Sequence, residues 1–287
     1  MPILSFRDPD PTQGNLLVAL AGPSGSGKTK SALIIAQSYA GCGRREGVAS
    51  KILLIDTEAG RGQFYAEEHG YTYAALLPPF SPERYLEALQ QAQEAGFEVV
   101  IVDSASHEWA GIDGVVDMAE ASSKKGLGKW AAPKYAHKRF MNGLLALKIP
   151  LIILCLRSKE KMVQRGSDIV SLGQQVVQEK EFAFEMSVQL LLTYDGHYDP
   201  KAYPPQYKVP GRLRPVFKGG QITEQTGVDL HAYMRKSGDE LLTAATDIAR
   251  QGTEAFREWW KSQPKPVRAR LDSHKTDLQK ICQEADS

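Results

Sequence analysis

Eight residues with the sequence Gly-Pro-Ser-Gly-Ser-Gly-Lys-Thr, at positions 22–29, constrain this chain more than any other feature. A continuous apolar run at residues 16–21 precedes them, which is typical of a strand buried on both faces of a parallel sheet. Residues 28–40 then follow a helical pattern that ends before Gly41. A glycine-rich turn in this position can wrap its backbone N–H groups around phosphate oxygens, and the helix dipole adds positive potential. The pattern therefore predicts a phosphate-binding P-loop.

Two side chains of the predicted P-loop suit the chemistry of a nucleoside triphosphate. Lys28 is expected to bridge the β- and γ-phosphates, and the hydroxyl of Thr29 is expected to ligate Mg²⁺. The predicted nucleotide contacts comprise the whole segment: Gly22, Pro23, Ser24, Gly25, Ser26, Gly27, Lys28 and Thr29.

Further apolar runs alternate with a helical pattern after the P-loop. Strands are predicted at residues 51–56, 71–77, 97–103 and 150–156, and a helix at residues 81–95. This alternation indicates an α/β fold in which a mostly parallel sheet is flanked by helices. Residues 188–194 and 206–209 lie on either side of a turn-rich stretch and predict a hairpin.

The chain is predicted to have three parts: a short N-terminal extension at residues 1–14, the α/β core at 15–238 and a helical C-terminal segment at 239–287. Two or three short amphipathic helices are expected in the last part. Phe256, Trp259 and Trp260 recur there at helical spacing, and we expect them to pack into a small core.

No feature of the sequence predicts a membrane span or a signal peptide. The longest apolar run, near residues 149–156, is strand-sized, whereas a membrane helix needs roughly 18 apolar residues. The first fourteen residues contain Pro, Asp and Arg where a signal peptide is apolar. Cys42, Cys155 and Cys282 are widely spaced and match no zinc pattern, so we expect reduced thiols in a cytoplasmic protein.

Two acidic residues follow predicted strands at the sheet edge where the P-loop lies. Asp103 ends an apolar strand, where a carboxylate can complete a Mg²⁺ site by holding a water molecule bound to the ion. Glu58 follows residues 51–56, and strand ends of this kind converge on the bound nucleotide. A carboxylate in that place can orient and deprotonate the attacking water, so Glu58 is the predicted catalytic base.

The residues around these two carboxylates resemble a known family. Asp56-Thr57-Glu58, followed later by Val102-Asp103-Ser104-Ala105, is similar to the core of RecA-type recombinases. Over about residues 16–230 the chain most resembles small phage-encoded, core-only RecA-like ATPases that act with single-strand annealing systems. The resemblance implies a RecA-like P-loop NTPase core, ATP as the nucleotide, a role in DNA recombination and assembly into a homo-oligomer.

Family members complete the site with a basic residue from the neighbouring subunit. The resemblance places that role at Lys208, where it would stabilise charge on the γ-phosphate. Arg157 and Lys159 follow the strand at 150–156 and compete for a trans-acting or sensor role.

Basic residues concentrate in one region of an otherwise nearly neutral chain. Between Glu120 and Arg165, eight Lys and three Arg face two Glu, a balance of +9, so the remainder sums to −8 for a total of +1. The cations are mixed with aromatic residues, which suits the phosphates and bases of single-stranded DNA. A second basic part opens at residue 159, and the chain from there to about residue 180 is predicted to be a loop. The candidate DNA contacts are Lys124, Lys125, Lys129, Trp130, Lys134, Lys138, Arg139, Lys161 and Arg165.

Two other functions remain open from the sequence. A P-loop kinase for a small metabolite would use the basic stretch as a lid. A nucleotide-dependent module would instead recruit a replication or recombination partner, such as a single-strand-binding or annealing protein, through its C-terminal helices.

Overall fold

A computed structural model of the chain describes residues 14–42, 46–199, 208–264, 267–268 and 271–286. The chain divides into two compact units. Asn15–His231 form the first, called the sheet unit below, and the described residues from Ala232 onward belong to the second, the C-terminal unit. The division falls at His231, whereas the sequence placed it near Gly238, which lies inside helix α7 (Glu224–Ala249).

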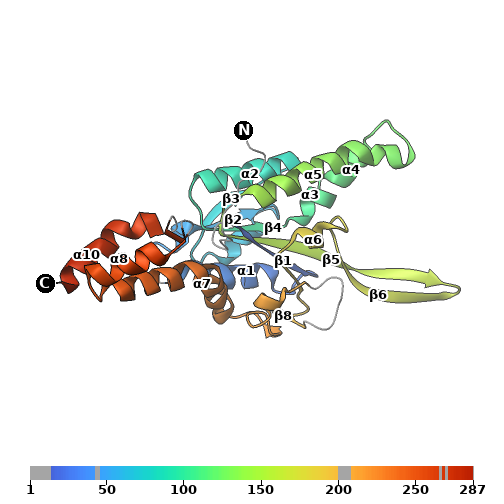
Figure 1. The fold of residues 1–287 in the computed structure, drawn as a ribbon. Helices are drawn as coiled ribbons and strands as arrows, with labels where there is room; N and C mark the ends of the chain where they lie inside the picture. The colour runs from blue at the N-terminus through green and yellow to red at the C-terminus, as the bar shows by residue number, and fades with distance from the viewer. Residues whose placement is uncertain (1–13, 43–45, 200–207, 265–266, 269–270, 287) are drawn as a thin grey trace. The chain divides into compact units, whose positions relative to one another are not determined.

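The sheet unit is built on a mostly parallel sheet (Figure 1). Its strands run in the order β3-β2-β4-β5-β1-β7. This confirms the predicted α/β fold with a mostly parallel sheet. The strands are β1 (Leu16–Gly22), β2 (Ile52–Asp56), β3 (Thr72–Ala75), β4 (Val99–Asp103), β5 (Leu151–Arg165) and β7 (Val188–Leu191).

Helices cover both faces of this sheet (Figure 1). Alternate residues of β1, such as Leu17 and Ala19, share a buried cluster with Tyr85 and Phe140, so α2 and α5 cover one face. The helix after β1 contacts β1, β4 and β5 from the other face (Figure 1). The helices are α1 (Lys28–Gly41), α2 (Pro82–Glu94), α3 (Ser106–Ala110), α4 (Val115–Glu120), α5 (Ala131–Ala146) and α6 (Phe182–Glu185). Short 3-10 turns include η2 (Ala49–Lys51), η3 (Arg61–Tyr65), η4 (Gly126–Trp130) and η5 (Gly211–Leu213).

The region after residue 156 differs from the predicted loop. Strand β5 continues to Arg165 and pairs antiparallel with β6 (Asp168–Val176), so the two strands form an arm that projects from the sheet (Figure 1). Gly166, at φ 64°, takes the first place of the two-residue turn, where a left-handed conformation is needed. The loop prediction was wrong because both faces of the arm are solvated. Its polar composition therefore lacks the apolar alternation of a half-buried strand.

The predicted hairpin at residues 188–209 lies partly outside the described residues, which omit 200–207. Strand β7 pairs parallel with β1, and Gln189 forms an antiparallel bridge with Lys208. A small separate sheet joins β8 (His197–Tyr198) to β9 (Gly220–Gln221).

The C-terminal unit contains helices α8 (Thr253–Ser262) and α10 (Lys275–Ala285), with η6 (Asp272–His274) between them. Its core includes Phe256, Leu271, Leu278 and Cys282, with Trp259 and Trp260 partly buried against it. The aromatic residues therefore pack as their helical spacing predicted. Among the residues that the structure describes, no helix combines the length and apolar character of a membrane span.

Candidate functional site

The P-loop connects β1 to α1 in a conformation that only glycine adopts readily at two positions. Gly25 and Gly27 have φ angles of 79° and 86°. A Cβ on Gly27 would lie 2.6 Å from the backbone nitrogen of Gly196, so the loop also packs too tightly there for a side chain. Helix α1 has no side-chain cap and no acidic residue in its first turn. Its N-terminal N–H groups and the positive end of its dipole therefore suit a phosphate group.

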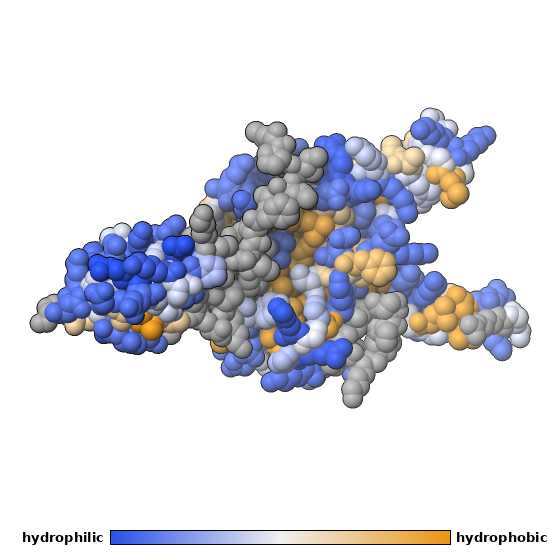
Figure 2. All heavy atoms as spheres, viewed as in Figure 1, coloured by the Kyte–Doolittle hydropathy of each residue, from blue (hydrophilic) through white to orange (hydrophobic). Residues whose placement is uncertain are grey.

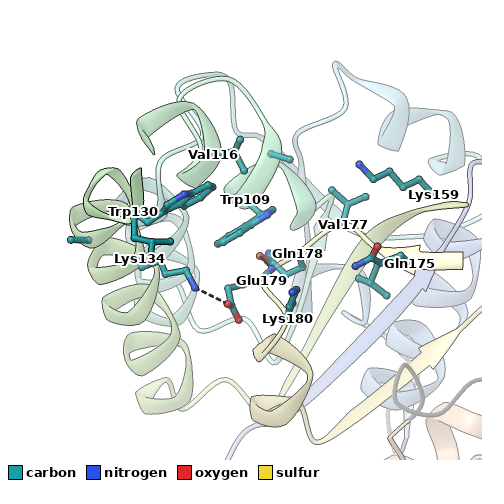
Figure 3. A pocket seen from close by; sticks show the side chains of 14 residues that line it. Trp109, Val116, Trp130, Lys134, Lys159, Gln175, Val177, Gln178, Glu179 and Lys180 are labelled. Carbon is teal, nitrogen blue, oxygen red and sulfur yellow. Dashed lines mark hydrogen bonds and ion pairs between the residues drawn. The ribbon is translucent and has the colours of Figure 1, made fainter. Parts of the chain in front are cut away.

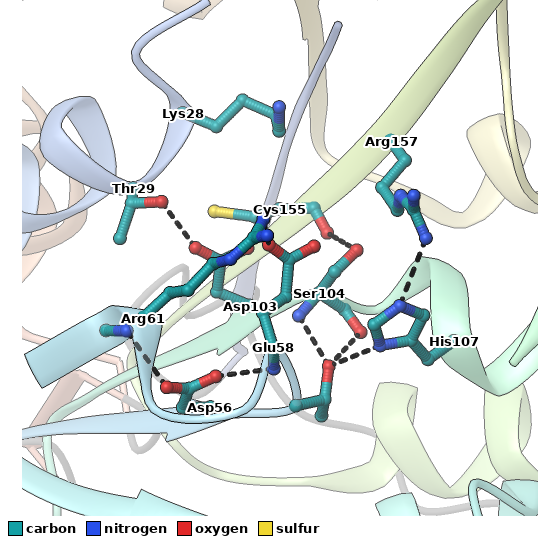
Figure 4. A network of polar contacts seen from close by, with 12 residues as sticks. Lys28, Thr29, Asp56, Glu58, Arg61, Asp103, Ser104, His107, Cys155 and Arg157 are labelled. Carbon is teal, nitrogen blue, oxygen red and sulfur yellow. Dashed lines mark hydrogen bonds and ion pairs between the residues drawn. The ribbon is translucent and has the colours of Figure 1, made fainter. Parts of the chain in front are cut away.

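Lys28 and Thr29 lie at the start of α1 and reach different partners. The Lys28 ammonium donates hydrogen bonds to the carbonyl oxygens of Gly22 (3.0 Å) and Pro23 (2.7 Å). The Thr29 hydroxyl donates to Oδ2 of Asp103 at 2.5 Å. The cation is thus held at the loop, and the hydroxyl is paired with the carboxylate that ends β4 (Figure 4).

Asp103 is a buried carboxylate at the centre of the sheet edge. It is only 8% exposed, and burial raises its pKa to about 6, with the hydrogen bond from Thr29 acting in the opposite direction. Oxygen atoms from a hydroxyl and a carboxylate are the ligands that Mg²⁺ prefers. Among the described residues, no group of three or more His, Cys, Asp or Glu could hold a metal alone. Thr29 and Asp103 therefore fit an ion that takes its remaining ligands from phosphate and water.

A cavity of about 430 Å³ lies beside the P-loop and is called the P-loop cavity below. Residues from several segments that follow parallel strands converge on it, as expected at this edge of an α/β sheet. The charged residues that line it are Lys28, Asp56, Glu58, Arg61, Asp103 and Arg157. The structure therefore brings together the P-loop, the predicted base and the predicted metal ligand.

Asp56 fixes the turn that carries Glu58. Its Oδ1 accepts the backbone N–H of Glu58 at 2.5 Å, and its Oδ2 accepts the N–H of Gly62 at 2.9 Å. The Glu58 side chain is 26% exposed and lies 3.7 Å from the guanidinium of Arg61. Asp56 thus holds the backbone of the turn, and Arg61 places a cation beside the carboxylate of Glu58.

A chain of hydrogen bonds joins this turn to β5 through the relay residues Thr57, His107 and Arg157 (Figure 4). The Thr57 hydroxyl lies 2.8 Å from Nδ1 of His107, and Nε2 of His107 lies 3.2 Å from the Arg157 guanidinium. Because a guanidinium only donates, Nε2 must accept and Nδ1 must carry the proton. Burial lowers the pKa of His107, which favours this neutral form.

Comparison with known protein families decides the affiliation of the chain. The sequence pattern of the AAA domain matches residues 15–202, about two thirds of the 287 residues. The chain belongs to the AAA-domain family. A separate comparison with curated proteins gives no match. The family match covers the P-loop, Glu58 and Asp103, and it identifies a nucleotide-binding domain of the P-loop ATPase kind.

Arg157 and Lys159, the two candidates for a trans-acting or sensor role, both lie on β5 of the AAA domain but face different cavities. Arg157 lines the P-loop cavity, whereas Lys159 lines a second cavity on the same unit. Lys208 lies outside the residues that line the P-loop cavity, and its ammonium donates to the carbonyl oxygen of Phe184 at 2.7 Å. A trans-acting role for Lys208 stays a prediction.

The predicted DNA contacts of the AAA domain fall on two projections of the sheet unit. One comprises the segment from Lys124 through η4 and continues along α5, and the other is the β5–β6 arm (Figure 1). Lys124, Lys125, Lys134, Lys138, Arg139 and Lys161 are exposed, and Lys129 and Trp130 are partly buried. The side chain of Arg165 lies outside the described part of the chain.

Asp56 and Arg61 were not predicted as parts of the AAA-domain site, and neither were the bridging contacts that His107 makes with Thr57 and Arg157. Asp56 ends a predicted strand, and Arg61 follows the predicted base by three residues. Their positions in the sequence were therefore only a weak indication that they belong to the site. His107 is reached only through contacts with residues about 50 positions away in the chain, which no local pattern reveals.

Proposed function

We propose that this AAA-domain protein is a RecA-like ATPase that binds single-stranded DNA and assists homologous recombination or annealing. The observation that carries the proposal is the course of β5. Along this single strand, Arg157 lines the P-loop cavity, Lys159 lines the second cavity, and Lys161 lies on the exposed arm. A movement of Arg157 that accompanies a change at the γ-phosphate can therefore be transmitted along β5 to the basic residues of the arm.

The chemistry at the P-loop cavity follows from the residues that line it. The P-loop N–H groups and Lys28 hold the phosphates. Glu58 accepts a proton from water, whose oxygen bonds to the γ-phosphorus as the bond to ADP breaks. Thr29 and Asp103 would hold Mg²⁺, which would supply positive charge to the phosphate oxygens. Arg157 lines the same cavity and is suited to stabilise charge on the γ-phosphate.

The two projections offer the mixture of charge and apolar surface that a single strand needs. Lys138 and Arg139 are exposed on α5, and Lys161 is exposed on the arm. The arm also exposes Met162 (53%) and Ile169 (71%), and Figure 2 shows an apolar patch among hydrophilic residues on this arm. Ammonium and guanidinium groups neutralise phosphates, while apolar side chains contact unstacked bases.

Assembly into a homo-oligomer is part of the proposal, because Lys208 would reach the nucleotide of a neighbouring copy. The physical support is its place on the chain that pairs with β7, away from its own P-loop cavity. A single-strand-binding or annealing protein is the partner class that this function requires.

The salt dependence of DNA binding tests the proposal. We expect the affinity for an oligothymidylate, measured by fluorescence anisotropy, to fall with salt, and the slope of log K against log salt to lessen by about 0.7 for each phosphate contact removed. Lys138→Ala and Lys161→Ala should each reduce the slope by that amount. Lys148→Ala is the matched control, because this exposed lysine precedes β5 at the opposite edge of the sheet. Equal slopes for all four proteins would contradict the proposed surface.

A further inference from the structure

A second cavity, of about 790 Å³, lies on the sheet unit between the η4–α5 projection and the base of the β5–β6 arm (Figure 3). It is called the tryptophan cavity here, because Trp109 of α3 and Trp130 of η4 line it. Their rings are stacked at an interplanar angle of 16°, with centroids 6.2 Å apart. Leu127 of η4 also lines the cavity and is 91% exposed. This arrangement leaves an aromatic and apolar wall open to solvent.

Three lysines surround that apolar wall. Lys134, Lys159 and Lys180 come from α5, β5 and the segment after β6, and all three are exposed (Figure 3). Glu179 lies among them and pairs with Lys134 at 3.3 Å. A ligand that combines a flat aromatic ring with negative charge matches these surroundings, because the ring packs on the indoles while the anion approaches the ammonium groups.

A buried polar network holds the wall in place. Glu108, which has no exposed surface, accepts from Nδ1 of His137 at 2.9 Å and from Nε2 of Gln178 at 3.3 Å. The ring of His137 packs edge-on against Trp109 at 5.5 Å. These contacts tie α3, α5 and the end of the arm together, so the cavity is formed before a ligand arrives. Preformed sites lose less conformational entropy on binding.

We propose that the tryptophan cavity binds one unstacked nucleobase of a single DNA strand, with the flanking phosphates near Lys134, Lys159 and Lys180. This inference rests on the proposed function and adds to it the place where a base is held. The base lies against the indole pair, while the phosphates of its neighbours meet the lysines. Because Lys159 stands two residues after Arg157 on β5, the base is held next to the strand that leaves the P-loop cavity.

This inference is tested by a thermodynamic cycle of four binding affinities, in which the Trp130 side chain and the DNA bases are removed separately and together. Affinities are measured by anisotropy for wild type and Trp130→Ala, each with an oligothymidylate and with an abasic sugar-phosphate strand of equal length. For wild type, we expect removal of the bases to weaken binding about tenfold or more. Trp130→Ala should bind the normal strand more weakly than wild type does, and its affinity should fall clearly less than that of wild type when the bases are removed. Trp130→Phe should restore most of the affinity.

Tyr135→Ala provides the matched control, because this aromatic residue is 66% exposed on α5 and does not line the cavity. The affinities of Tyr135→Ala for the oligothymidylate and for the abasic strand should equal those of wild type. Additive effects of the Trp130 and base changes would overturn the cavity assignment while leaving the proposed function standing. Failure of wild type to bind either strand would overturn both.

A fluorescence measurement serves if Trp130→Ala does not fold. Of the four tryptophans, Trp259 and Trp260 lie on α8. With both replaced by Phe, emission comes from Trp109 and Trp130. Oligothymidylate should quench it and the abasic strand should not. Equal quenching by both strands would count against a base in the cavity.

Discussion

Arg157 and Lys159 stand two positions apart on β5, yet Arg157 lines the P-loop cavity and Lys159 lines the tryptophan cavity. The strand pairs with β4 up to Cys155 and with β1 up to Arg157, and it continues into the arm after that. A displacement of Arg157 therefore acts on the start of the arm.

Replacing Lys28 by Ala should abolish tight nucleotide binding. The ammonium provides a charge-assisted hydrogen bond to phosphate, which is worth about 1.5–3 kcal/mol, or roughly ten- to a hundredfold in affinity. Isothermal titration with a non-hydrolysable ATP analogue measures the change. Lys30→Ala is the control, since Lys30 lies exposed on α1 outside the P-loop cavity. Equal affinities of the two variants would contradict the assignment of Lys28.

Replacing Glu58 by Gln should preserve nucleotide binding and remove turnover. The amide keeps the size of the side chain but is a far weaker base, and general-base catalysis contributes about 10²- to 10⁴-fold. Single-turnover hydrolysis together with a binding titration separates the two effects. Glu67→Gln, at an exposed position on the same loop region, should behave as wild type. Normal hydrolysis by Glu58→Gln would show that another group acts as the base.

Replacing His107 by Ala should uncouple the P-loop cavity from the arm. The substitution breaks the bridge between Thr57 and Arg157, and residues that connect two sites change their coupling by about 0.5–2 kcal/mol. We expect nucleotide affinity to stay close to wild type while the difference in DNA affinity with and without ATP analogue shrinks. His274→Ala, exposed in the C-terminal unit, is the control. An unchanged difference for His107→Ala would exclude the relay.

Replacing Gly227 by Ala should destabilise the sheet unit. A Cβ at this position of α7 would lie 2.4 Å from the carbonyl oxygen of Ile35 and 2.1 Å from Oγ of Ser38, both on α1. Overpacking of this kind costs about 1–3 kcal/mol, to be measured by denaturant unfolding. Gly211→Ala corrects for the entropy of the unfolded chain, because nothing lies within 4 Å of a Cβ there. Similar stabilities of the two variants would refute the close contact.

The sheet and the P-loop could be predicted because their signals are local. Strands buried on both faces are continuous apolar runs, and β1, β2 and β4 are buried at every position. The arm could not be predicted by the same rule, since its side chains are mostly exposed. The signal that was available is Gly166-Ser167 between the apolar pairs Met162-Val163 and Ile169-Val170, a turn with glycine in its first place.

The tryptophan cavity could not be predicted for a different reason. Trp130 was a candidate because it lies among lysines, whereas its partner Trp109 comes from α3 and was not among the predicted site residues. The contact depends on how α3, η4 and the end of β6 meet in space. Tertiary contacts between such distant segments leave no periodicity in the sequence.

The rate of ATP hydrolysis with and without single-stranded DNA tests the central claim most directly, with Lys28→Ala as the blank. We expect a rise of about tenfold on adding DNA, equivalent to about 1.4 kcal/mol of activation free energy. An unchanged rate, together with no DNA retained in a binding assay, would contradict it.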